Sequence, residues 1–312
     1  MYKPFVSFVL ITHNNIRTIR KNLLSIQAQS YNKKEIIAVD DGSGDGTINV
    51  LENFNVRVIK IPPCPAAKAL NVGFRSAKGD IICYLGADAY LESKNWLDSV
   101  IQAFKKFKPD AVITNMIPKN AYTNPYAYYC AMGPLSISTK GSFWYKETTG
   151  FLCNCSFLKE SLQEVGFANE HFRVAEDTEL LHRFRKKKKK ILHLSSVRVI
   201  HDHDFGFRNL CKLSWKQGKS RGAFYKLHPD FRTLRSKIKL FFILGILVAF
   251  MCSLFYFPFL NLLMLISLFG YEINRVAEAK KHFGFLNFLQ IIFYAAVDDG
   301  LRFFAFLTGA IF

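Results

Sequence analysis

The sequence predicts an α/β domain with a mainly parallel sheet and helices on both faces, followed by apolar helices at a membrane. Short apolar runs alternate with segments of helical period over residues 5–114, which is typical of parallel strands joined by helices. Residues 240–271 then carry no charge. Because half of the 312 residues are hydrophobic and only 21% are charged, the composition excludes a disordered chain.

Strands and helices are expected in strict alternation over the first part of the chain. Apolar runs bounded by turn residues predict strands, and apolar residues three or four positions apart predict helices. The expected order is strand Phe5–Ile11, helix Ile16–Gln29, strand Glu35–Val39, helix Thr47–Phe54, strand Val56–Ile61, helix Ala66–Ala77, strand Asp80–Leu85, helix Lys94–Phe107 and strand Ala111–Thr114. Ligands of such sheets bind at the carboxyl ends of the strands.

The positive charge is concentrated in one stretch. Lys and Arg number 42 against 24 Asp and Glu, and Arg183–Leu240 alone holds 18 basic and three acidic residues. Its run Lys186–Lys190 is expected to face anionic lipid headgroups, at about 1 kcal/mol per residue near the surface; a solvated helix end is the alternative. Nucleic acid is not an expected partner, because no aromatic platform or recognition helix accompanies the lysines.

The uncharged segment Leu240–Tyr271 has 32 residues, a helical length of about 48 Å against a hydrocarbon core of roughly 30 Å. Pro258 lies near its middle and favours two helices, about 240–257 and 259–272; one strongly tilted helix is the alternative. A third apolar segment, 283–312, contains Asp298, Asp299 and Arg302, so it is expected either to lie in the interface or to span.

These segments divide the chain into a domain of residues 1–236 and a membrane domain of residues 237–312. The N-terminal sequence Met1-Tyr-Lys-Pro lacks the pattern of a signal peptide. We therefore expect a multi-pass protein of the cell membrane with its large domain in the cytoplasm. The seven cysteines are an odd number scattered through apolar segments, and they are interpreted as reduced packing residues.

Polar residues follow three of the predicted strands: Thr12 to Asn14, Asp41 and Asp88. A carboxylate at a strand end can accept hydrogen bonds from a nucleoside or bind a divalent cation. Considered alone, the segment Asp40–Thr47 is typical of a plain turn before a capped helix. Its glycine spacing matches neither the dinucleotide fingerprint nor a P-loop.

Five strings in this order resemble the inverting family-2 glycosyltransferases of GT-A fold, a Rossmann-like architecture. They are Val6-Ser-Phe-Val-Leu-Ile-Thr-His-Asn-Asn, Ile37-Ala-Val-Asp-Asp-Gly-Ser-Gly-Asp-Gly-Thr, Pro65-Ala-Ala-Lys-Ala-Leu-Asn-Val-Gly-Phe-Arg-Ser-Ala-Lys-Gly-Asp, Tyr84-Leu-Gly-Ala-Asp-Ala, and Val165-Gly-Phe with Ala175-Glu-Asp-Thr-Glu-Leu-Leu-His-Arg-Phe. The resemblance covers about residues 4–222. It implies a nucleotide-binding half, 1–114, and an acceptor half, 115–236.

The resemblance assigns six residues to the nucleoside diphosphate of a sugar donor: Thr12, Asn14, Asp41, Lys68, Asn71 and Asp88. Asp88 matches the last carboxylate of the family's Asp-x-Asp motif, which binds Mn²⁺ or Mg²⁺. The first Asp of that motif is replaced by Gly86, which leaves the cation short of protein ligands. His201, at the end of a strand-like run, is the predicted second ligand, and His203 is the next candidate.

Glu176 and Asp177 resemble the family's acceptor motif, in which the Asp removes the proton of the attacking hydroxyl. Asp177 is therefore the predicted base, with Glu176 beside it on the acceptor side. An acidic first helical turn that offsets the helix dipole explains the same residues in isolation. Trp144 and Tyr145 are expected to stack on a sugar in the acceptor region.

The sequence thus predicts a membrane-anchored enzyme that transfers a hexose from a nucleoside-diphosphate sugar to a hydroxyl of a lipid-linked, polyprenyl-type glycan, once per acceptor. A processive polysaccharide synthase is one alternative, although Gln217 to Arg221 lacks that group's spacing and following Trp. Transfer to a polyprenyl phosphate is another, although an ionised phosphate needs no base. The replacement by Gly86 leaves open a non-catalytic sugar-nucleotide sensor.

Overall fold

The computed structural model describes residues 3–121, 123–125, 127, 143–144, 154–172, 176–202, 206–228, 270, 273 and 284–311. The chain forms two compact units. The first comprises Met1–Lys119 and Ala131–Asp204, and the second comprises Asn120–Cys130 and Phe205–Phe312.

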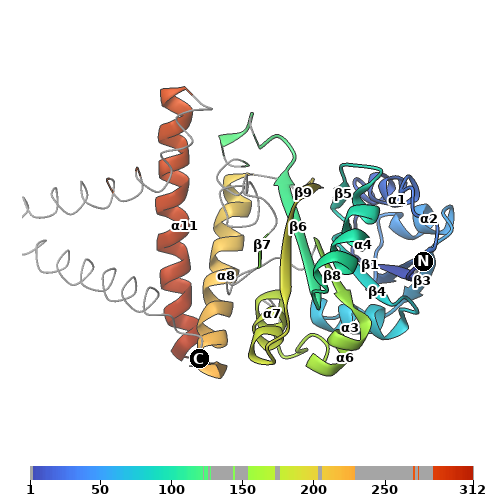
Figure 1. Ribbon diagram of the computed structural model, residues 1–312. Coiled ribbons are helices and arrows are strands. Elements are labelled where there is room, and N and C mark those ends of the chain that lie inside the picture. Colours follow the sequence, from blue (N-terminus) through green and yellow to red (C-terminus); the bar gives the residue numbers. More distant parts are fainter. Residues whose placement is uncertain are drawn as a thin grey trace, which may run out of the picture. The chain divides into compact units, whose positions relative to one another are not determined.

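The first unit is built on one sheet (Figure 1). Within the described residues the sheet has nine strands, in the order β3-β2-β1-β4-β8-β6-β9-β5, with β7 also paired to β9. The strands are β1 (Val6–Thr12), β2 (Lys34–Asp40), β3 (Arg57–Lys60), β4 (Ile81–Leu85), β5 (Ala89–Leu91), β6 (Ala111–Pro118), β7 (Phe143–Trp144), β8 (Asn154–Leu158) and β9 (Ile191–His201). The five predicted strands and their order along the chain are therefore present.

The sheet is mixed rather than mainly parallel, which corrects the predicted topology. β1, β2, β3 and β4 are parallel, as their helical crossovers require. β8 lies between β4 and β6 and runs antiparallel to both of them. β6 and β9 are parallel to each other, and β5 is antiparallel to β9.

Helices cover both faces of the sheet, as expected, and successive residues of β1 show why. Phe8 and Leu10 belong to a core formed with α1 (Ile19–Gln27), α2 (Thr47–Glu52) and α4 (Trp96–Phe107). Val9 points to the other face and packs in a second core with α3 (Ala66–Ser76), α6 (Lys159–Val165) and α7 (Glu176–Lys186). A strand buried on both faces has the continuous apolar sequence seen here.

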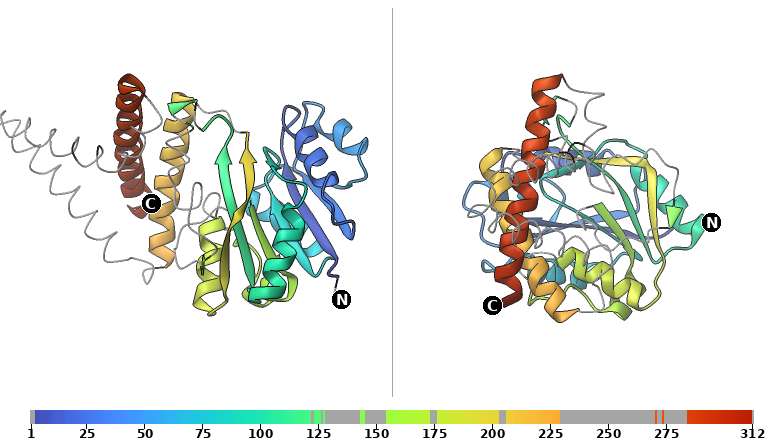
Figure 2. Two further views of the ribbon diagram at one scale, coloured as in Figure 1. Left: turned by 45° about the horizontal axis from the view of Figure 1, so that its top comes forward. Right: turned by 90° about the vertical axis from the view of Figure 1, so that its left-hand side faces the viewer.

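The described part of the second unit consists mainly of α8 (Phe207–Leu227) and α11 (Phe285–Ile311), which lie side by side (Figure 2). Gly218 allows their close approach, because a Cβ there would lie 2.3 Å from the Arg302 carbonyl oxygen. Ser214 Oγ donates a hydrogen bond of 2.5 Å to the buried Asp298. These contacts group α8 with the C-terminal helix, whereas the charge pattern had grouped it with residues 1–236.

The predicted membrane helices are mostly outside the described residues, including 240–257 and nearly all of 259–272. The third, 283–312, is present as the helix α11. Within the part of the chain that the structure describes, no helix is both long enough and apolar enough to cross a membrane. The two alternatives for the segment 283–312 stay predictions, as do the other two helices.

Candidate active site

Strand direction brings the predicted site residues to one edge of the sheet. β1, β2 and β4 are parallel, and β8, antiparallel to both β4 and β6, gives β6 and β9 the same direction as β4. The carboxyl ends of these five strands therefore share an edge, and Asp41, Asp88 and His201 lie at it. This is the edge at which α/β sheets bind their ligands.

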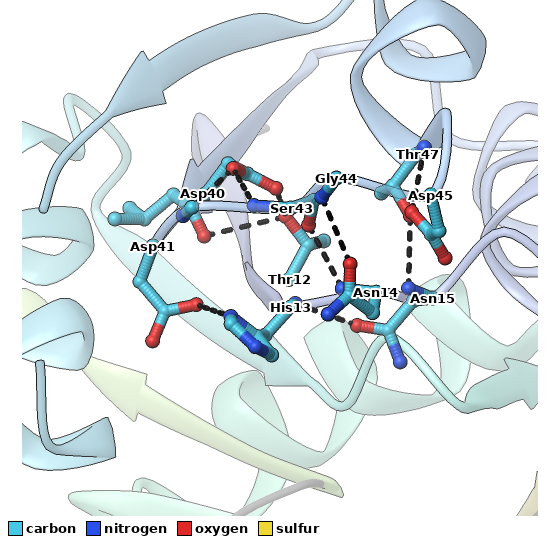
Figure 3. Close-up of polar contacts among 12 residues, drawn as sticks. Thr12, His13, Asn14, Asn15, Asp40, Asp41, Ser43, Gly44, Asp45 and Thr47 are labelled. Atoms are coloured by element: carbon cyan, nitrogen blue, oxygen red, sulfur yellow. Dashed lines mark hydrogen bonds and ion pairs between the residues drawn. The ribbon is translucent and has the colours of Figure 1, made fainter. Parts of the chain in front are cut away.

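The loops after β1 and β2 are bonded to each other at this edge (Figure 3). Asn14 adopts the left-handed conformation at φ 56°. Its side-chain Oδ1 accepts a hydrogen bond from the backbone N–H of Gly44, and its backbone N–H donates to Ser43 Oγ. The backbone N–H of Asn15 donates a hydrogen bond of 2.8 Å to Thr47 Oγ1. The predicted nucleoside-binding residue Asn14 thus joins two loops that the sequence separates by some thirty positions.

Asp40 and Asp41 have different surroundings. Asp40 is buried and accepts hydrogen bonds from the Thr12 hydroxyl and the amides of Gly42 and Ser43. Burial acts to raise the pKa of Asp40, but the hydrogen bonds from Ser43, Gly42 and Thr12 outweigh it and hold that pKa below its usual range. Asp40 and Thr12 therefore stabilise the turn, and the buried Thr12 hydroxyl is bonded within the protein.

The Asp41 carboxylate points toward the loop after β1 (Figure 3). It forms a hydrogen bond with His13, whose Nδ1 lies 2.9 Å from Asp41 Oδ1. The His13 side chain is 53% exposed and that of Asp41 is 13% exposed. His13 was absent from the predicted site. Its position directly after the end of β1, between two predicted site residues, is the signal that could have identified it.

Lys68 and Asn71 lie on α3, which begins near the same edge. Lys68 is exposed, and its charge acts on the Cys64 thiol, as the charge of Asp41 does, so these three residues are neighbours. Asn71 is buried, and its Nδ2 donates to the Ala168 carbonyl and to Glu170 Oε1 over 2.9 and 2.7 Å. Its amide group therefore holds the loop before α7, and its predicted place beside the donor stays a prediction.

Asp88 and His201 are in direct contact, as the metal prediction requires. His201 Nε2 lies 3.1 Å from Asp88 Oδ2, and the two side chains are 20% and 29% exposed. The buried Asn22 stabilises the turn that carries Asp88, because its Nδ2 donates hydrogen bonds to the backbone carbonyls of Gly86 and Ala89. A carboxylate oxygen and an imidazole nitrogen suit Mn²⁺.

Among the described residues there is no group of three or more His, Cys, Asp or Glu side chains that could hold a metal. Of the residues predicted to bind the ion, Asp88 and His201 meet in the structure, and their role as ligands stays a prediction.

Glu176 and Asp177 open α7. Asp177 Oδ1 accepts a hydrogen bond of 2.6 Å from the Thr178 amide, so it bonds to the first turn of the helix. Burial, and after it the negative charge of Asp177, raises the pKa of Glu176 to about 7. Perturbed carboxyl groups of this kind are enriched at functional sites. Glu179, one turn on, is bonded to Arg183 and belongs to the packing of α7.

The remaining predicted residues contribute less. The backbone of Trp144 pairs with Leu192, which lies near the start of β9, whereas His201 is the last residue of that strand. The structure therefore does not bring the Trp144 backbone to the site edge. Tyr145 and His203 lie outside the described residues. Cys64, Cys83 and Cys211 are free cysteines, and burial raises the pKa of the Cys83 thiol to about 12.

The lysine run is partly used inside the first unit. Lys189 Nζ forms ion pairs with Glu164 and Asp110 over 2.5 and 3.3 Å, and Lys187 donates to the Glu164 carbonyl. Burial acts to raise the pKa of Asp110. The hydrogen bond from Ser161, and after it the contacts with Lys190 and Lys189, outweigh burial and keep that pKa below its usual range. Lys189 is therefore engaged in ion pairs within the first unit, and the contact of the lysine run with anionic headgroups stays a prediction.

The sequence model of "Glycosyl transferase family 2" matches residues 7–166, half of the chain, and the chain belongs to that family. This confirms the family-2 part of the resemblance.

Related proteins from several bacteria match parts of the chain. An "Uncharacterized glycosyltransferase" of Haemophilus influenzae is 33% identical over 29% of this chain. The "Poly-beta-1,6-N-acetyl-D-glucosamine synthase" of Staphylococcus aureus is 31% identical over 34% of this chain. The matched regions span 39% and 26% of those two proteins. The "O-antigen chain rhamnosyltransferase WbaN" of Salmonella anatum is 25% identical over 72% of this chain and 73% of its own.

Solved structures share the fold. The mannosyltransferase PcManGT of Pyrobaculum calidifontis, in complex with GDP-Man and Mn²⁺, has a TM-score of 0.61 at 16% identity and covers all of this chain and 88% of its own. S. aureus TarS with UDP-GlcNAc has a TM-score of 0.55 at 14% identity and covers 97% of this chain and 90% of its own. These likenesses confirm a GT-A-like fold.

Proposed function

We propose that this chain is a metal-dependent, inverting glycosyltransferase that transfers a hexose from a nucleoside-diphosphate sugar to a hydroxyl of a lipid-linked glycan. The observation that carries the proposal is the contact between Asp88 and His201 at the same sheet edge as Asp41. Family membership and relatives named as glycosyl-transferring enzymes support the reaction class.

The donor is proposed to lie along the loops after β1 and β2. Asp41, oriented by His13, would accept hydrogen bonds from the nucleoside, and the bonds between the two loops keep that carboxylate in place before the donor arrives. Lys68 is exposed near Asp41, and its ammonium would lie beside the diphosphate. GDP-Man and UDP-GlcNAc in the two proteins of like fold support this donor class.

Asp88 and His201 would hold the divalent ion, Mn²⁺ or Mg²⁺. When bound, the ion would neutralise charge on the diphosphate as it leaves. The chain contributes an oxygen and a nitrogen ligand on two strands, and the bonds from Asn22 keep the Asp88 turn from shifting.

Asp177 is proposed as the general base. The acceptor hydroxyl oxygen would bond to the anomeric carbon while the bond to the diphosphate oxygen breaks, and Asp177 would take the hydroxyl proton. Attack from the face opposite the leaving group inverts that carbon. Glu176, with a pKa of about 7, holds its proton more readily than an ordinary carboxyl, which leaves the negative charge of the pair on Asp177.

The acceptor is proposed to be lipid-linked because of the uncharged segment 240–271 and the basic stretch before it. Both favour attachment to a membrane with anionic lipids and the first unit on its cytoplasmic side. A site at that surface would meet the headgroup of a polyprenyl-type carrier.

The test is transfer of radiolabelled sugar from a panel of UDP- and GDP-sugars into extracted lipid by the full chain with Mn²⁺. Replacing Asp177 by Asn should lower the rate by at least 100-fold, because general-base catalysis contributes about 10²–10⁴. Asp98→Asn is the matched control, since Asp98 also lies in the first turn of a helix, α4. Undiminished transfer by Asp177→Asn would refute the base, and label in a water-soluble product alone would refute the lipid acceptor.

A further inference from the structure

The segment that follows β9 is held on both sides by neighbouring strands. On one side, the Asp202 amide donates a hydrogen bond of 2.7 Å to the Asp88 carbonyl. On the other side, the Lys119 amide, at the end of β6, donates to the His201 carbonyl over 2.8 Å. The strand pairing agrees, since Ala89 and Pro118 both stand beside His201. Figure 1 shows β5, β9 and β6 as neighbours.

A side-chain contact strengthens the second of these links. Lys119 Nζ lies 2.7 Å from Asp202 Oδ2, and the two side chains are 45% and 20% exposed. Lys119 thus binds the backbone of His201 and the side chain of Asp202, the residue directly after it. Asp202 in turn binds the turn that carries Asp88.

These contacts give the Asp202 carboxylate a fixed partner. It is a carboxylate directly adjacent to His201 in the chain, and hard cations bind carboxylates well. The ion pair with Lys119 fixes the residue directly after His201, and the backbone amide of that residue supports the turn that carries Asp88.

We propose that Lys119, through its ion pair with Asp202, is a positioning residue for the Asp88–His201 pair and sets the affinity of that pair for a divalent cation. The inference rests on the proposed metal dependence and deepens it. Groups that orient a metal ligand typically change metal affinity by 10- to 100-fold when they are removed. An exposed ion pair contributes little to overall stability, so affinity and stability should separate.

The experiment is a titration of the full chain with Mn²⁺ alone, followed by the electron paramagnetic resonance signal of the free ion. Lys119→Met should weaken Mn²⁺ binding about ten-fold, and Lys119→Arg should restore it, because arginine keeps the charge next to Asp202. Lys60→Met is the control: it removes another lysine–carboxylate ion pair, with Glu52 at 3.0 Å, from a different and more exposed part of the unit. All variants should melt within about 2 °C of the wild type.

The ion pair itself is tested by a double-mutant cycle. Asp202→Asn should weaken Mn²⁺ binding to a similar degree, and the double variant with Lys119→Met should lose little more, because both changes break one contact. Unchanged affinity in Lys119→Met, failure of arginine to restore binding, or additive losses would each overturn the inference. If the wild type binds no Mn²⁺, the inference and the metal role both fail, whereas sugar transfer and its dependence on Asp177 are measured separately.

Discussion

Adjacent residues with the same side chain do different work in this protein. Asp40 is enclosed by four hydrogen-bond donors and stabilises a turn, while Asp41, one position on, is directed toward His13 at the sheet edge. The reason is the pleat of β2, which sends consecutive side chains to opposite sides as the strand ends. The resemblance assigned Asp41 rather than Asp40 to the donor, and this assignment stays a prediction.

Glu176 leads to a prediction about pH and stability. Its pKa is about 7 in the folded protein, above the value of 4.5 expected in the unfolded chain. Between these values the folded state holds the proton and the unfolded state does not, so the free energy of unfolding falls as pH rises from about 4.5 to 7. Glu176→Gln should remove this decline, by up to roughly 1.4 kcal/mol per pH unit, in urea denaturation measured at pH 5, 6 and 7.

The control for this measurement is Glu160→Gln, which changes an exposed acid in the first turn of α6. It should keep the pH dependence of the wild type. If Glu176→Gln and Glu160→Gln give parallel curves, the pKa of Glu176 is not raised in the folded protein.

The fit of helices on the sheet depends on a few small residues. Gly73 lies on the face of α3 that packs against β1 and β2, and a Cβ there would lie 2.4 Å from Val9 Cγ1 and 3.3 Å from Val39 Cγ2. Both valines are buried, so neither has space to move away. The helix can lie close to the strands only because position 73 has no side chain.

Gly73→Ala is therefore expected to destabilise the first unit by about 1 to 3 kcal/mol, although alanine is the better helix former. The matched control is Gly44→Ala, since a Cβ at position 44 meets nothing within 4 Å. The control should stay within about 0.5 kcal/mol of the wild type in urea denaturation. Equal stability of the two variants would show that α3 can shift without loss.

Across the molecule, the acids of the candidate site and the excess of positive charge lie in different parts of the chain. Asp41, Asp88 and Asp177 precede Arg183, where the excess of basic residues begins, whereas His201 lies within that basic stretch. Lys189 is paired within the first unit, so that part of the excess contributes to the fold rather than to a surface. The proposed membrane contact thus depends on the other basic residues of this stretch.

Ligand binding at the sheet edge should stabilise the protein as a whole. A nucleoside diphosphate and Mn²⁺, each at 100 times its Kd, would add about 2.7 kcal/mol per site, because they bind only the folded state. Thermal melting of the wild type should therefore shift upward when both are present. Asp88→Asn should lose the part of the shift that depends on Mn²⁺, and Asp177→Asn should keep the whole shift, since Asp177 is assigned to the acceptor. An equal shift in Asp88→Asn would contradict the proposed ion site.

The sequence by itself determined the order of strands and helices in the first 114 residues, except for the three-residue strand β5. Apolar periodicity is a local property, and parallel strands carry their loops to one edge whatever the details of packing. The five strings also indicated the family through their resemblance to it.

The tertiary structure decided which of those residues are available. The insertion of β8 antiparallel to β4 and β6, the use of Asn71 to hold Ala168 and Glu170, and the pairing of Trp144 away from His201 all depend on contacts between distant parts of the chain. The partners of Asp41 and Asp202, His13 and Lys119, arise in the same way. A hydrogen bond between residues far apart in sequence leaves no periodic signal, so only the folded chain shows which side chains meet.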